Sequence, residues 1–107
     1  MSEARNWLSE RIAAAPDPLR ERMLEALAEV NGGGTIYGQL ADAAAICLRN
    51  AMAEQALRVC AIGLLAADAL MTHACEAAAE AGGDELAAFA EAWDAERFEQ
   101  LLHADTA

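Results

Sequence analysis

Residues 35–81 read TIYGQLADAAAICLRNAMAEQALRVCAIGLLAADALMTHACEAAAEA, and this stretch decides the fold. It holds 47 residues with seven charged side chains and no proline. One straight helix of this length would extend about 70 Å at 1.5 Å per residue, which exceeds the size of a small domain, so the helix must break. The polar stripe changes phase near Arg49 and Asn50. We therefore expect a break there, followed by a central apolar helix over about 51–81.

The amino-acid composition favours helix throughout the chain. The 107 residues include 29 alanines and 13 leucines but only nine β-branched residues, a mix typical of helices rather than strands. A chain of this length can bury a core without disulfides or metals. We expect residues 1–107 to form one all-α domain, a compact bundle of about five to six helices whose alanine-lined faces approach closely.

Turn and cap residues predict the helices on the N-terminal side of this stretch. Apolar side chains at helical spacing indicate a first helix over 3–15, with Ser2 as a cap. Asp17 and Pro18 are typical of the start of a second helix, which Asn31 and Gly32 end. Thr35 is expected to cap the long helical stretch, because glycines precede it and apolar residues follow.

Similar signals predict the C-terminal helices. Gly82 and Gly83 end the central helix, and Asp84 starts the next. The apolar face of that next helix is expected at Leu86, Phe89, Ala90 and Trp93. Asp94 and Glu96 are typical of a new helix start, so a short final helix is expected over about 95–103, with a single bent helix as the alternative.

The net charge restricts the classes of partner. Seven arginines, no lysine and 18 acids give a net charge of −11, which disfavours nucleic acid and anionic lipid and favours either solubility or a basic protein partner. No run approaches the roughly 18–20 apolar residues of a membrane span, and the N-terminus lacks a signal-peptide core. Three cysteines without a C-x-x-C spacing fit reduced thiols. We expect a cytoplasmic protein that binds neither nucleic acid nor membrane.

The stretch MTHACEAA (71–78) places His73 near Cys75 and Glu76. On a helix, residues two apart point about 200° from each other, so His73 and Cys75 cannot converge on one ion. His73 can meet Glu76, but further ligands at suitable spacing are missing. We interpret His73 as a solvent-facing residue, and we expect no metal site and no cofactor.

Other patterns are also better explained by structure than by chemistry. The glycine-rich stretch before Tyr37 lacks the lysine of a phosphate-binding loop, so we interpret it as a turn and Tyr37 as a residue at the core edge or in a groove. The carboxylate pairs Glu91/Asp94 and Glu96/Glu99 lie in one terminal segment rather than on facing helices. Arginines and glutamates alternate in the first two helices, which is typical of a solvated face. No catalytic residue is assigned.

The stretch VCAIGLLAA (59–67) carries no side chain more polar than cysteine, which predicts a helix covered on all sides by its own chain or by a partner subunit. Gly63 marks either a kink or a close helix crossing. The leading hypothesis is a non-catalytic, self-associating interaction module, expected to be a homodimer. The interface candidates are Cys60, Leu64, Leu65 and Met71.

Two alternative functions remain open. The first is a small-molecule-binding helical bundle, with methionine and cysteine side chains in an adaptable pocket. Its pocket candidates are Tyr37, Asp68 and His73. The second, less favoured, is a metal-dependent enzyme that uses acids on facing helices, in which Asp68 would be the leading candidate because it interrupts an apolar stretch.

Overall fold

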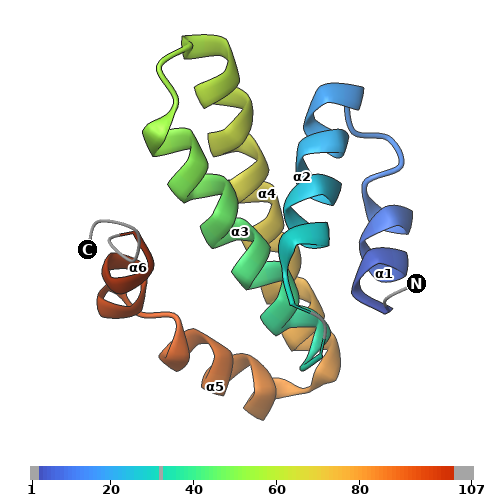
Figure 1. Ribbon diagram of the computed structural model, residues 1–107. Helices are drawn as coiled ribbons and strands as arrows, with labels where there is room; N and C mark the ends of the chain where they lie inside the picture. Colours follow the sequence, from blue (N-terminus) through green and yellow to red (C-terminus); the bar gives the residue numbers. More distant parts are fainter. Residues whose placement is uncertain (1–2, 32, 103–107) are drawn as a thin grey trace.

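The computed structural model describes residues 3–31 and 33–102, and in these ranges it contains six helices and no strand (Figure 1). The helices are α1 (Glu3–Arg11), α2 (Asp17–Glu29), α3 (Ile36–Ala53), α4 (Leu57–Ala81), α5 (Gly83–Ala92) and α6 (Ala95–Leu102). The predicted all-α bundle of five to six helices is confirmed. The expected cap Ser2, the expected stop Gly32 and the last residue of the predicted final helix, His103, lie outside the described residues.

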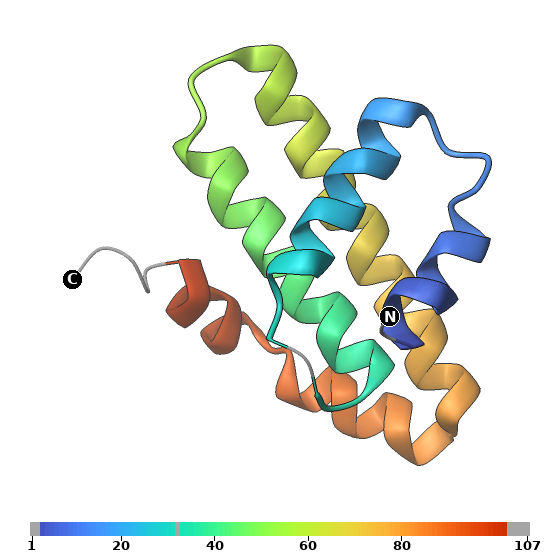
Figure 2. The ribbon, with the colours of Figure 1, turned by 45° about the vertical axis from the view of Figure 1, so that its right-hand side comes forward.

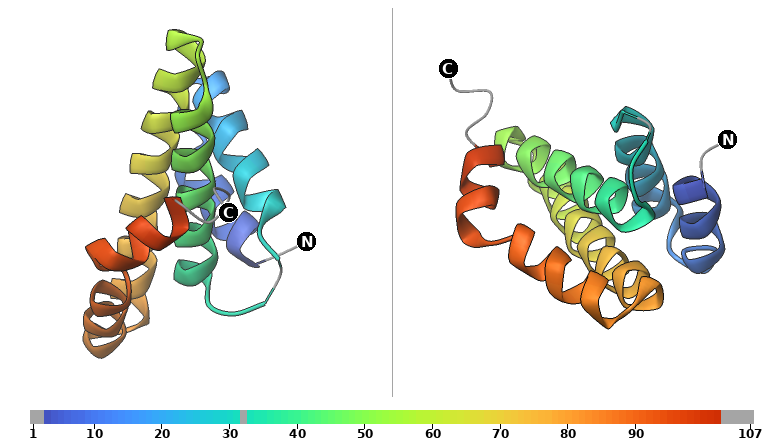
Figure 3. Two further views of the ribbon diagram at one scale, coloured as in Figure 1. Left: turned by 60° about the vertical axis from the view of Figure 1, so that its left-hand side comes forward. Right: turned by 90° about the horizontal axis from the view of Figure 1, so that it is seen from below.

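An antiparallel hairpin of α3 and α4 forms the centre of the molecule (Figure 1). Helices α1 and α2 lie on one side of this hairpin, α5 crosses one end, and α6 returns beside α3 (Figure 2). The other end of the hairpin, where α3 leads into α4, extends away from α1, α5 and α6 (Figure 3). This end therefore has few neighbours within the chain.

The core combines a few large apolar side chains with many alanines. Leu8, Met23, Leu40, Cys47 and Leu70 are the largest fully buried side chains. Nine alanines join them in one continuous cluster: Ala4, Ala26, Ala41, Ala43, Ala44, Ala66, Ala74, Ala77 and Ala78. Small side chains let helix axes approach closely, which increases packing contacts between backbones.

The break between α3 and α4 differs from the prediction. Helix α3 continues through Arg49 and Asn50 to Ala53, so the expected break near residue 50 and the expected start of the central helix at 51 are wrong. The turn occupies residues 54–56. The Glu54 carboxylate accepts a hydrogen bond from the Ala56 backbone N–H at 3.0 Å. The polar stripe therefore changes phase within a continuous helix and does not mark its end.

Gly63 marks a close helix crossing and not a kink, because α4 is continuous across it. A Cβ atom added at Gly63 would lie 3.0 Å from the Ala51 Cβ and 3.7 Å from the Cys47 carbonyl oxygen. Two carbon atoms at their optimal separation are about 3.5–4.0 Å apart. Glycine therefore allows α4 to approach α3 at this point.

Two of the predicted helix boundaries need correction on the N-terminal side. Helix α1 ends at Arg11 rather than near 15, although Ile12 remains buried in the turn that follows. Asp17 is the first residue of α2 and not its cap. Pro16 occupies the cap position, and the Asp17 carboxylate pairs with Arg20. Thr35 caps α3 as predicted, since its Oγ1 accepts a hydrogen bond from the Gly38 N–H at 3.0 Å.

The C-terminal helices follow the predicted boundaries closely. Gly82 has a φ of 143°, a backbone conformation that glycine adopts without strain, and it separates α4 from α5. The Asp94 carboxylate accepts a hydrogen bond from the Arg97 N–H at 2.9 Å and caps α6. On α5, Phe89 is buried and Leu86 and Trp93 pack against the core, but Ala90 is exposed, contrary to the prediction.

Candidate functional site

The end of the α3–α4 hairpin carries the large apolar side chains that the described part of the chain exposes. These are Met52 (64% exposed), Leu57 (88%), Val59 (38%), Leu64 (44%) and Leu65 (59%), which we call the apolar hairpin end. Single exposed leucines are common on protein surfaces, but a cluster of five along 14 residues is not. Of the two kinds of cover expected for residues 59–67, the described chain does not provide the first on all sides, and cover by a partner subunit stays a prediction.

The outward face of α4 changes character along its length. Leu57, Ala61 and Leu65 follow one another at i, i+4 spacing and are all exposed. Further along the same face lie Asp68 and Thr72, which are also exposed. The apolar part of this face therefore extends over residues 57–65, about 12 Å at 1.5 Å per residue.

The full length of α4 also bears on the predicted absence of a membrane span. By length and composition, Leu57–Ala81 is apolar enough to cross a membrane, with 22% of its most apolar window buried, so the sequence does contain one segment of that kind. The core helix of a soluble protein can pass the same test. The exposed apolar face is much shorter than the roughly 30 Å hydrocarbon layer of a bilayer.

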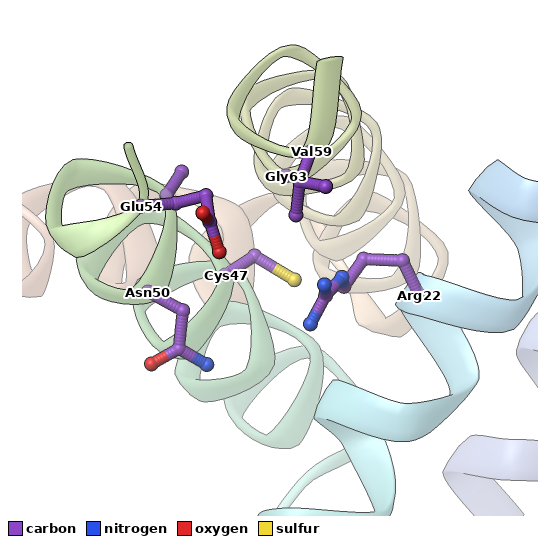
Figure 4. A pocket seen from close by; sticks show the side chains of 7 residues that line it. Arg22, Cys47, Asn50, Glu54, Val59 and Gly63 are labelled. Atoms are coloured by element: carbon purple, nitrogen blue, oxygen red, sulfur yellow. The ribbon is translucent and has the colours of Figure 1, made fainter. Parts of the chain in front are cut away.

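A cavity of about 130 Å³ lies beside the apolar hairpin end, between α2, α3 and α4 (Figure 4). Arg22 extends from α2 into this space, and Cys47 lies at its base on α3 (Figure 4). Asn50 and Glu54 line it further along α3, and α4 contributes Val59 and Gly63. Two shallower grooves, of about 350 and 200 Å³, adjoin it and are also lined by Arg22.

The electrostatic environment of the cavity is mixed. Burial raises the pKa of the Cys47 thiol to about 11, an effect that Arg22 opposes and that Glu29 and Glu25 reinforce. Cys47 is thus a neutral thiol at physiological pH and a poor nucleophile. The cavity brings together a cation, a thiol, an amide and a carboxylate.

The four interface candidates from the sequence lie on different parts of α4. Leu64 and Leu65 are exposed and belong to the apolar hairpin end, whereas Cys60 and Met71 are half-buried. Leu64 and Met71 also line an apolar groove of about 250 Å³ beside α6. The other residues of this groove are Ala44, Leu48, Ala67, Asp68 and Phe98.

The three pocket candidates do not come together. Asp68 is exposed at the edge of the groove beside α6, as expected for a polar residue on the outer surface of a helix. Tyr37 donates a hydrogen bond to the Glu85 carboxylate, which raises the pKa of its hydroxyl, and its ring packs edge-on against Phe89 at 5.5 Å. Tyr37 therefore fastens α3 to α5 and lies at the core edge.

His73 is half-buried rather than solvent-facing, because Trp7 of α1 packs edge-on against it with ring centres 6.3 Å apart. Its Nδ1 atom lies 2.6 Å from Glu76 Oε1, but the direction of this contact is not that of a hydrogen bond. Arg11 stacks on the Trp7 ring and pairs with Glu80 at 2.6 Å. His73 thus takes part in the docking of α1.

Within residues 3–31 and 33–102, no three histidine, cysteine, aspartate or glutamate side chains converge to hold a metal ion. The cavity residues Arg22, Cys47, Asn50 and Glu54 did not emerge from the sequence as a site. Arg22 belongs to the mixed-charge face that we interpreted as solvated, but its side chain is only 32% exposed. The position of Arg22, four residues after Pro18, gave no indication of this burial, because the opposite wall of the cavity is formed by two other helices.

Comparison with protein-family models, with curated proteins and with solved structures finds no match to this chain. The geometry of the described residues therefore carries the functional argument.

Proposed function

We propose that this protein is a non-catalytic interaction module that pairs with a second copy of itself through the apolar hairpin end. The observation that carries the proposal is the exposure of Met52, Leu57, Val59, Leu64 and Leu65 at one end of the molecule. Large apolar side chains that are exposed together, rather than scattered singly, mark interaction sites on protein surfaces. A stable interface buries about 800 Å² on each partner, so the contact would extend beyond these five side chains.

The distribution of charge favours contact at this end. Residues 43–67 carry two arginines and one glutamate, a net charge of +1, whereas the whole chain carries −11. By contrast, residues 82–107 carry seven acids and one arginine, a net charge of −6. Two copies that meet at their hairpin ends therefore bring their least repulsive regions together and keep α5, which lies at the opposite end of the hairpin, apart (Figure 1).

The exposed alanine between these leucines supports a helix-to-helix contact. Ala61 lies one helical turn from both Leu57 and Leu65 on the outward face. A small side chain between larger ones allows side chains of a facing helix to interdigitate. In a two-fold dimer the same patch serves both partners, so α4 would pack against α4.

Sedimentation velocity over a range of concentrations tests the proposal. We expect the wild-type chain to convert from monomer to dimer as concentration rises. The dissociation constant of the Leu57→Ser/Leu65→Ser dimer should be at least about 100-fold higher, because each leucine buried in the interface contributes on the order of 1 kcal/mol or more. Ala79→Ser, an exposed substitution further along α4, is the matched control. A wild-type chain that stays monomeric at about 200 µM would overturn the proposal.

A further inference from the structure

Arg22 offers hydrogen-bond donors that no described residue accepts. Its guanidinium points into the cavity between α2, α3 and α4 (Figure 4). Its one ion-pair contact among residues 3–31 and 33–102 is with Glu25 at 3.9 Å, beyond hydrogen-bond distance. Two-thirds of the side chain is removed from solvent. A guanidinium in such a position matches the two oxygens of a carboxylate.

The α3 wall of the cavity offers acceptors. One oxygen of the Glu54 carboxylate accepts the Ala56 N–H at 3.0 Å, which holds the side chain in place and leaves the second oxygen without a partner in the described part of the chain. Asn50 lines the cavity one turn earlier, with its amide directed away from Arg22 and Glu54 (Figure 4). An ammonium group is the ligand group that the Glu54 carboxylate suits best.

The charges around the cavity exclude a ligand with only one sign of charge. Glu25 and Glu29 lie on the same helix as Arg22, close enough to raise the pKa of the Cys47 thiol, and the whole chain is strongly acidic. A simple anion is therefore repelled, and a simple cation meets Arg22 at the centre of the site. A ligand that carries both charges and no net charge avoids both penalties.

The volume of the cavity limits the size of the ligand. A cavity of about 130 Å³ is close to the roughly 150 Å³ that holds benzene in an engineered site, so it accommodates about six non-hydrogen atoms. Beyond the polar groups, its walls are Val59, Gly63 and the Cys47 thiol. The adjoining grooves give a longer side chain a way out along α2.

We propose that this cavity binds a small α-amino acid, with its carboxylate on Arg22, its ammonium group toward Glu54, and its side chain against Val59 and Gly63. L-Alanine has the size and both charged groups that the cavity requires. The cavity shares Val59 with the apolar hairpin end but contains none of Leu57, Ala61 and Leu65, and the proposal does not rest on self-association.

Nuclear magnetic resonance titration with three probes of equal size tests the proposal. L-Alanine carries both charges, isobutyrate keeps only the negative charge, and L-alaninamide keeps only the positive charge. We expect L-alanine to shift the backbone amides of Gly63 and Asn50 in a saturable way. Isobutyrate and L-alaninamide should each bind about tenfold more weakly or worse, because each loses one charge-assisted contact.

A pair of charge-matched variants assigns the effect to Arg22. Arg22→Gln should weaken L-alanine binding at least about tenfold. Arg58→Gln removes the same charge from an exposed residue outside the cavity and should leave binding unchanged. The proposal is overturned if L-alanine gives no saturable shift up to about 50 mM, if isobutyrate binds as tightly as L-alanine, or if Arg22→Gln binds like wild type.

Discussion

Substitution of Gly63 by alanine sets two energies of opposite sign against each other. Alanine in the interior of a helix is about 1 kcal/mol more favourable than glycine, so the change would stabilise α4 if the helix were isolated. In the folded chain the new methyl carbon would lie 3.0 Å from the Ala51 Cβ, 3.6 Å from its Cα and 3.7 Å from the Cys47 carbonyl oxygen. Only the 3.0 Å distance is tighter than normal contact, and the Ala51 methyl group has no side-chain rotation that would move it away.

The two helices must therefore separate by a few tenths of an ångström to restore normal carbon contact. Overpacking of this kind costs about 1–3 kcal/mol. After the gain in helix propensity is subtracted, we expect Gly63→Ala to lower the free energy of unfolding by about 1 kcal/mol. That corresponds to a decrease in Tm of roughly 4–8 °C for a domain of about this size.

Urea unfolding followed by circular dichroism measures this change, with all variants at one protein concentration because self-association would add to the apparent stability. Gly83→Ala is the control, since a Cβ at this first residue of α5 meets nothing within 4 Å. It should leave stability unchanged or raise it by up to about 1 kcal/mol.

A second substitution on α3 identifies the clash as the cause. Ala51→Gly removes the methyl group that the new Gly63→Ala side chain meets, so the double variant should be less destabilised than the sum of the single changes by about 1 kcal/mol. A Gly63→Ala chain that is as stable as wild type, or more stable, would refute the inferred close approach of α4 and α3.

Three other predictions, two for substitutions and one for a labelling reaction, follow from features described above. Thr35→Ala should cost about 1 kcal/mol in urea unfolding by removing the α3 cap, and Thr35→Ser should retain most of that stability. Arg11→Ala should cost on the order of 1 kcal/mol, because it removes both the Glu80 ion pair and the stacking that fix α1; part of this cost should disappear in high salt. Iodoacetamide at pH 8 should modify exposed Cys75 well before Cys47, whose raised pKa keeps the thiol protonated until the pH nears 11; peptide mass spectrometry that finds equal rates in the native state would contradict this.

The helices with explicit start and stop residues were predictable from the sequence. Thr35, Gly82 and Asp94 act locally, through hydrogen bonds or backbone conformations that neighbouring residues alone decide. The turn at 54–56 has no glycine or proline, and its main visible support is the Glu54 carboxylate bound to the Ala56 N–H. A single contact of this kind makes the turn only slightly more favourable than continuation of the helix. The pattern of polar residues instead predicted a break near Arg49 and Asn50.

The cavity was not predictable for a different reason. Arg22 has the same local surroundings as the other arginines of the first two helices, and only the position of α3 and α4 converts it into a half-buried group. The exposed leucines were predictable as interface candidates because of their apolar run. That the chain itself leaves Leu65 uncovered depends on how far α2 and α6 extend along the hairpin, which periodicity does not encode.

The two tryptophans lie in separate parts of the fold with different neighbours. Trp7 packs between Arg11 and His73 where α1 meets α4, whereas Trp93 packs against Phe98 with ring centres 5.3 Å apart, where α5 meets α6. Each indole therefore reports fluorescence from its own helix junction. Two variants that each keep only one of these tryptophans can be unfolded separately. Emission changes at the same denaturant concentration would indicate one cooperative unfolding unit. Changes at different denaturant concentrations would show that the two ends of the polypeptide detach from the central hairpin separately.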